Sequence, residues 1–137
     1  MSKIYSVAVF RRGNEIEVMT VRGVPKERHK EQETMLLSDG YKLDSMVAMT
    51  DRNLFNKYHL KARLKELRTY VKQSEEYLST IKDEEVREES RACFNDYVEN
   101  VLMAKIARLT RRCLENEIEV TDELALQCLD YINSTKY

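Results

Sequence analysis

Residues 60–81 read LKARLKELRTYVKQSEEYLSTI. The apolar positions in this stretch step alternately by four and three residues with one polar interruption, at Leu60, Leu64, Leu67, Val71, Ser74, Leu78 and Ile81. This is the a/d spacing of a helix that packs along its length against another helix. It is the most regular pattern in the chain, and it predicts a long amphipathic helix at the centre of the fold.

A partner for this helix follows directly. Residues 82–84 (Lys-Asp-Glu) indicate a break, and the acidic pair at 84–85 favours a new helix N-terminus. The next segment has a broad apolar face to about residue 115, formed by Val86, Cys93, Phe94, Tyr97, Val98, Val101, Leu102, Ile106, Leu109 and Cys113. So broad a face predicts contact with more than one neighbour. We expect an antiparallel hairpin that turns about Lys82.

Both ends of the hairpin have structure of their own. After residue 120, Thr121 and Asp122 can cap a shorter helix with Leu124, Leu126, Cys128, Leu129 and Ile132 inward. All three glycines and the one proline lie in the first 40 residues. There, β-branched runs at 4–10 and 16–21 flank a turn, a polar helix is expected at 26–37, and an alternating strand at 41–49. Asp39 and Gly40 can close that helix through a left-handed glycine.

The sequence therefore predicts an α+β fold that is mostly α. Residues 1–50 form a small β-β-α-β sheet unit, and residues 51–137 form the helical hairpin plus a short C-terminal helix. We expect the two parts to pack as one domain, with strands confined to the first 50 residues. The apolar surface of the hairpin exceeds what two helices need, so a homodimer is also predicted.

Composition excludes several classes of function. The net charge is −1, and no stretch approaches 18 apolar residues, so neither a general affinity for polyanions nor a membrane span is indicated. No apolar segment follows a basic start at the N-terminus, which favours a cytoplasmic protein. The three cysteines are widely spaced without a CxxC pair, and we interpret them as reduced thiols.

Motifs for catalysis, cofactors and metals are missing. Neither a phosphate-binding glycine loop nor a nucleophile elbow occurs. His29 lies among glutamates on what we interpret as a solvated helix face, and His59 is interpreted as a helix-flank residue rather than a general base. We therefore expect no catalytic residue, no cofactor and no metal site.

Charge is arranged in blocks of alternating sign. Residues 51–72 carry seven basic residues against two acids, residues 73–99 nine acids against three bases, and residues 100–114 four bases and no acid. An antiparallel hairpin would bring the two basic blocks together at its base and gather the acids at its tip. The predicted partner-binding residues are Lys57, Lys61, Lys65, Arg68, Lys105, Arg108, Arg111 and Arg112. The competing interpretation is that these side chains are merely solvated.

These observations favour a protein-binding module, such as an adaptor, regulator or inhibitor, that uses its charge-segregated hairpin. The alternative is a nucleic-acid-binding regulator that contacts phosphates through the basic base of the hairpin. The short, tryptophan-free, charge-rich composition resembles that of small phage-encoded proteins that bind host machinery. That resemblance implies a protein partner and assigns no residue.

Overall fold

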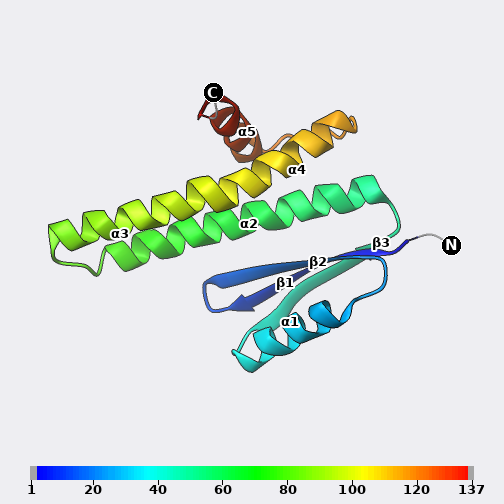
Figure 1. Cartoon of the computed structure of the whole chain (residues 1–137), viewed down its shortest axis with the longest axis horizontal. Coiled ribbons are helices and arrows are strands. Elements are labelled where there is room, and N and C mark those ends of the chain that lie inside the picture. The colour runs from blue at the N-terminus through cyan, green and yellow to red at the C-terminus, as the bar shows by residue number, and fades with distance from the viewer. Residues whose placement is uncertain (1–2, 136–137) are drawn as a thin grey trace.

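The computed structural model describes residues 3–135 and confirms the mostly helical α+β fold (Figure 1). The elements in chain order are β1 (Tyr5–Arg12), β2 (Glu15–Arg22), α1 (Glu27–Ser38), β3 (Lys42–Met49), α2 (Arg52–Leu78), α3 (Glu84–Tyr97), η1 (Val98–Leu102), α4 (Met103–Glu115) and α5 (Glu123–Thr135). The predicted β-β-α-β start and the helical remainder are both present. The ends of the strands and of α1 differ from prediction by one or two residues, whereas α2 ends three residues before Ile81, the last position of the predicted a/d pattern.

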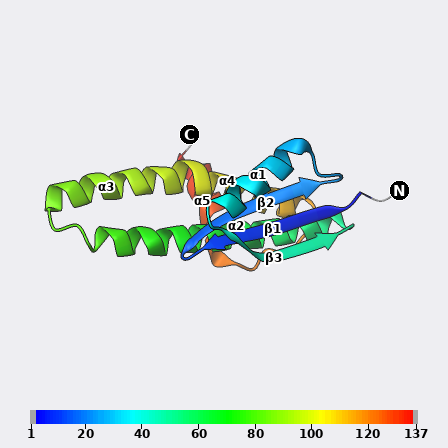
Figure 2. The same ribbon diagram turned by 90° about the horizontal axis from the view of Figure 1, so that it is seen from below.

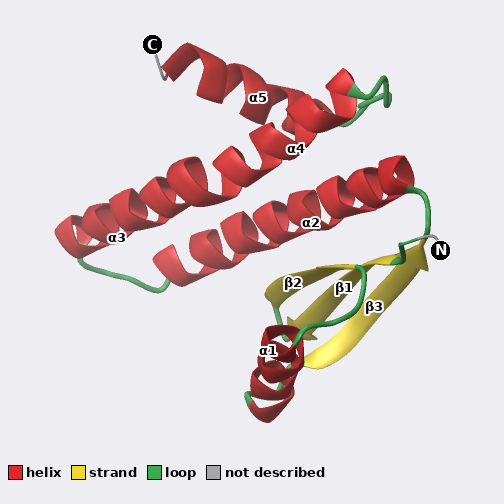
Figure 3. Cartoon of the chain, turned by 45° about the vertical axis from the view of Figure 1, so that its right-hand side comes forward, coloured by secondary structure: helices red, strands yellow, loops and turns green. Residues whose placement is uncertain are grey.

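The three strands form an antiparallel sheet in the order β2-β1-β3. Gly13 has φ +60 in the turn between β1 and β2, a conformation that most side chains disfavour. One face of the sheet packs Val7, Val9 and Val18 against Phe55 of α2. The opposite face packs Phe10 and neighbours against α1, so α1 and α2 cover opposite sides of the sheet (Figures 1 and 3).

The central helix α2 begins at a capped N-terminus, and the chain then returns antiparallel to it through α3, η1 and α4. The carboxylate of Asp51 accepts hydrogen bonds from the backbone N–H groups of Asn53 and Leu54 at 2.8 and 3.2 Å. Leu60, Leu64 and Leu67 are buried in one core with apolar side chains of η1, α4 and α5. The predicted a/d positions of α2, which we call the leucine seam, therefore hold the two arms of one hairpin together.

The apolar surface that remains on the hairpin base is covered within the chain. The sheet packs on α2, and α5 packs on α4, where Ala125 and Cys128 are fully buried beside Cys113. Burial raises the pKa of the Cys113 and Cys128 thiols. The surplus surface on which the predicted dimer was based is thus used for intramolecular packing.

Two expectations for buried side chains are wrong. Val86 is 47% exposed, Tyr97 is 41% exposed and Val71 is 42% exposed, although each lies on a predicted apolar face. For Val86 the reason is the length of the hairpin, because the start of α3 projects past the sheet (Figures 1 and 2) and has no second neighbour there. His59, expected at the helix flank, is instead buried with only 9% exposed.

Candidate functional site

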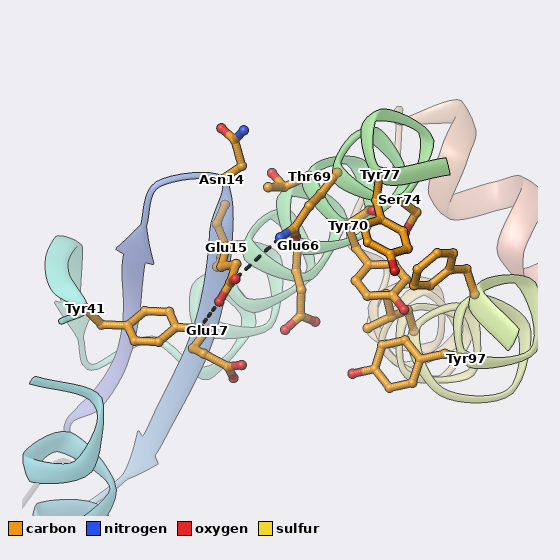
Figure 4. A pocket seen from close by; sticks show the side chains of 14 residues that line it. Asn14, Glu15, Glu17, Tyr41, Glu66, Thr69, Tyr70, Ser74, Tyr77 and Tyr97 are labelled. Atoms are coloured by element: carbon orange, nitrogen blue, oxygen red, sulfur yellow. Dashed lines mark hydrogen bonds between the residues drawn. The ribbon is translucent and has the colours of Figure 1, made fainter. Parts of the chain in front are cut away.

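The sheet and the returning helices flank α2 and leave a cavity of about 430 Å³ between them. Its walls are the start of β2, one side of α2, and the junction of α3 with η1. Figure 4 shows carboxylates from β2 and α2 on one side and tyrosines from α2 and α3 on the other. We call this space the groove cavity.

Aromatic rings form one wall of the groove cavity. The Tyr70 and Tyr97 ring centroids lie 4.9 Å apart, and Phe94 meets the edges of Tyr70 and Tyr77 at 6.1 and 5.8 Å. Such offset and edge-on pairs are the favourable arrangements of aromatic rings. Tyr77 is nevertheless 55% exposed, so part of this aromatic surface remains open to a ligand.

Carboxylates form the facing wall, and two of the three are already engaged. Glu15 accepts hydrogen bonds from Arg12 at 2.6 Å and from the Tyr41 hydroxyl at 2.9 Å. The Arg12 hydrogen bond is the main reason that the pKa of Glu15 is lowered. Glu66 pairs with Arg63 at 3.0 Å. These partners hold both carboxylates in place.

Glu17 differs from the other two carboxylates. It is exposed on β2, and the hydrogen bonds and ion pairs of the described residues do not include its side chain. Its pKa is raised, first by partial desolvation against the surrounding protein and then by the negative charge of Glu66. The pKa of Tyr97 is also raised, by burial first and then by Glu66 and Glu17. The cavity therefore contains negative charge that a cation would relieve.

The π-helical turn η1 explains how the α3–η1 junction supplies this wall. Tyr97 and Leu102 both line the groove cavity, although five residues of a regular α-helix rotate side chains apart by about 140°. In η1 the backbone N–H of Met103 bonds to the carbonyl of Val98, five residues earlier. The wider turn brings both side chains to the same cavity, and such turns are frequent at functional sites.

His59 lies buried on α2, one turn before Arg63. His59 Nε2 accepts a hydrogen bond from Arg63 Nε at 3.4 Å, while the buried Nδ1 atom has no partner in the described structure. Burial lowers the pKa of His59 to about 4, with further lowering by the positive charges of Arg63, Arg22, Arg112 and Lys105. An unpaired buried polar atom costs on the order of 1–3 kcal/mol.

The eight predicted partner-binding residues lie on three different surfaces of the protein. Lys61, Lys65 and Arg68 line a shallow cavity between α2 and the β1–β3 side of the sheet, on the same exposed stripe of α2 as Lys57. Arg108 and Arg111 face α5, where Arg111 donates to Asn133 at 2.9 Å. Lys105 and Arg112 lie on α4, and their positive charges contribute to the lowered pKa of His59.

Several of these basic residues have intramolecular partners. Lys65 pairs with Asp44 of β3 at 3.0 Å, and Arg68 with Asp122 at 2.8 Å. Sequence reasoning did not predict the groove cavity, because the walls of the cavity come from residues that are far apart in the sequence. Gln73 and Glu15, for example, are in contact at 3.5 Å. One signal was present: Glu66, Tyr70, Gln73 and Tyr77 repeat at helical spacing on α2, beside the leucine seam.

The comparisons with known proteins supply no relative, because no family model, curated protein or solved structure matched the chain. Among residues 3–135, no group of three or more potential ligands is placed to hold a metal ion. Over the same residues, no helix combines the length and the apolar character needed to cross a membrane.

Proposed function

We propose that this protein is a protein-binding module that receives a lysine or arginine side chain of its partner in the groove cavity. The observation that carries this proposal is the pairing of an open aromatic wall with the carboxylates of Glu15, Glu17 and Glu66. A cation over an aromatic face gains about 0.5–2 kcal/mol, and neighbouring carboxylates add charge complementarity.

The raised pKa of Glu17 supports this proposal. A bound ammonium or guanidinium group would offset the negative charge of Glu66 that acts on Glu17 and favour the ionised form of Glu17. The size of the cavity also fits, since about 430 Å³ lies within the range of small ligand pockets and exceeds what one side chain needs.

A binding role is better supported than catalysis by the same residues. Catalysis by a pair of carboxylates needs both groups to be free to react or exchange protons with a substrate. Glu15 and Glu66 are instead held by Arg12 and Arg63, which leaves Glu17 as the one carboxylate of the three without such a partner among the described residues.

The alternative proposal, phosphate contacts along the basic base of the hairpin, has less support. A nucleic-acid backbone requires a continuous set of available cations. Lys65, Arg68 and Arg111 are engaged within the chain, and the remaining predicted residues face different neighbours.

Selection of random peptides against the full chain tests the proposal. We expect the selected peptides to contain a lysine or arginine whose replacement by methionine weakens binding at least tenfold. The double variant Glu17→Gln/Tyr77→Ala should lose these peptides. The matched control Glu119→Gln/Tyr58→Ala changes the same residue types at exposed positions outside the cavity and should retain them. Equal binding by both variants, or failure to select any basic peptide, would refute the proposal.

A further inference from the structure

The strand β3 lies at one edge of the sheet, and its outer side has no partner strand among residues 3–135 (Figure 3). Its first half has features that oppose further strand pairing, namely the charged Lys42 and Asp44 and a shift of register between Val9 and Phe10 of β1. Its second half, residues 45–49 (Ser-Met-Val-Ala-Met), contains no charge and no proline and pairs with β1 in unbroken register. This half therefore presents backbone N–H and C=O groups to which another strand can bond.

On the α2 side of the sheet, β3 borders a basic cavity of about 450 Å³. Ser45 and Val47 of β3 line this cavity, and so do Lys61 and Lys65 of α2. Lys65 already holds a carboxylate that comes from a strand, because Asp44 of β3 lies 3.0 Å from its Nζ atom. Lys61 is exposed and takes part in no ion pair of the described residues. An acidic side chain placed beside Ser45 or Val47 would therefore meet an available cation.

The opposite side of the same edge is apolar. Met46 pairs with Ala8 and Leu43 with Phe10, which places Met46 and Leu43 on the side of the sheet that faces α1. These two side chains are nevertheless 62% and 52% exposed, so α1 does not cover them. Ala48 follows on the same side of β3 and is also exposed. Apolar side chains of an added strand would pack against these residues as cross-strand neighbours.

We propose that the edge of β3 binds an extended segment of a partner protein in which acidic and apolar residues alternate. Successive side chains of a strand point to opposite sides of its sheet, so the acids would lie beside the basic cavity and the apolar residues beside Met46. Neighbouring strands are about 4.8 Å apart, which keeps the acids within reach of the long Lys61 side chain. Strand addition of this kind takes its affinity from backbone hydrogen bonds and its specificity from alternate side chains.

A second copy of this chain is a poorer occupant of the edge. Antiparallel pairing of two β3 strands about a two-fold axis would keep both α2 helices on one side of the joined sheet. Lys61 and Lys65 of the two copies would then share one groove, where like charges repel. Pairing between copies through β3 should therefore be weak, and the acidic segment should displace a second copy.

A blocked peptide of three Glu-Val repeats tests the proposal, with a peptide of three Lys-Val repeats as its counterpart. Nuclear magnetic resonance of the full chain should show saturable shift changes on β3 with the acidic peptide and none with the basic one. Amide hydrogen exchange of β3 should become slower when the acidic peptide binds, because the added strand bonds the outward N–H groups. The double variant Glu17→Gln/Tyr77→Ala alters only the groove cavity and should retain the peptide, so the two proposals can fail independently.

Matched variants distinguish this site from general electrostatic attraction. Lys61→Glu should weaken the acidic peptide about tenfold, because a repulsion replaces an attraction. Lys57→Glu makes the same change one turn earlier on α2, outside the cavity lining, and should retain the affinity. On β3, Ser45→Glu adds a negative charge at the cavity and should weaken binding more than Ala48→Glu, which adds it on the opposite side of the strand. Thermal unfolding of each variant checks that the fold persists.

Any of several results would overturn the proposal. The first three are no saturable binding of the acidic peptide, equal weakening by Lys61→Glu and Lys57→Glu, and binding without slower exchange on β3. Tighter binding of a mixed-sequence oligonucleotide than of the acidic peptide would assign the basic cavity to nucleic acid instead. A β3 dimer that saturating peptide fails to dissociate would assign the edge to a second copy.

Discussion

Arg68 donates from Nη2 to both carboxylate oxygens of Asp122, at 2.8 and 3.0 Å, across 54 positions of sequence. The same carboxylate accepts the backbone N–H of Leu124 at 3.0 Å and so caps α5. A single aspartate thus ends the connection from α4, begins α5 and attaches it to α2. Arg68, predicted as a partner-binding residue, has a structural contact here.

Replacing the two partners should have unequal effects. Asp122→Ala removes both the cap and the ion pair and should lower the free energy of unfolding by about 1–2 kcal/mol. Arg68→Gln removes only an ion pair whose side chains are 55% and 33% exposed, which is worth under about 1 kcal/mol. Urea unfolding measures both. Equal losses would mean that the cap contributes nothing.

The leucine seam offers a matched pair of core and surface positions. Leu67 is 3% exposed, while Val71, the next position of the same pattern, is 42% exposed. Leu67→Ala should cost about 2–5 kcal/mol because it leaves a cavity, and Val71→Ala should cost less than about 1 kcal/mol. Chemical unfolding of both variants at one pH checks this. Similar costs would contradict the packing described for α2.

His59 should make stability depend on pH. Its pKa of about 4 in the folded protein lies below the usual 6.5, so the unfolded chain binds a proton first as pH falls. Stability should be complete above pH 6.5 and should decline toward pH 4, by roughly 3 kcal/mol in total. In His59→Phe, the free energy of unfolding should change less between pH 7 and pH 5 than in the unmodified protein, as measured by urea unfolding at each pH. Glu15 and Asp44 have lowered pKa values and titrate below that window.

Much of the fold follows from local patterns. Gly40 has φ +90 at the end of α1, as the left-handed closure required, and Asp122 caps the helix that was expected to follow it. Helix caps and left-handed glycines depend on residues that are adjacent in the sequence, so sequence patterns predict them. The leucine seam predicted a partner helix because a/d spacing is typical of helices that pack along one another.

The candidate sites could not be predicted in this way. The groove cavity depends on how β2 packs against α2. The pattern that predicts the helical hairpin carries no information on the position of the sheet relative to α2. The π-turn at Val98–Leu102 has no proline or glycine to reveal it, yet it brings Tyr97 and Leu102 to one cavity. His59 is buried beside Phe55, which packs against the sheet, and that burial is a tertiary property.

Self-association remains a prediction, and the structure moves it to another surface. β3 is an edge strand of the described sheet, and its Leu43 and Met46 are 52% and 62% exposed. Exposed apolar edge strands pair readily with other strands, and an edge lysine opposes this. We expect a concentration-dependent dimer that Met46→Lys dissociates, measured by light scattering. A monomer at all concentrations would contradict the prediction.

The groove cavity is tested most directly by titrating the full chain with N-acetyl-arginine methylamide under nuclear magnetic resonance. We predict saturable shift changes confined to the residues around Glu17, Tyr70, Tyr77 and Tyr97, lost in Glu17→Gln/Tyr77→Ala and retained in Glu119→Gln/Tyr58→Ala. N-acetyl-methionine methylamide, which lacks the charge, should produce none. Shift changes elsewhere in the protein, or equal responses to the arginine and methionine compounds, would contradict a cation site in this cavity.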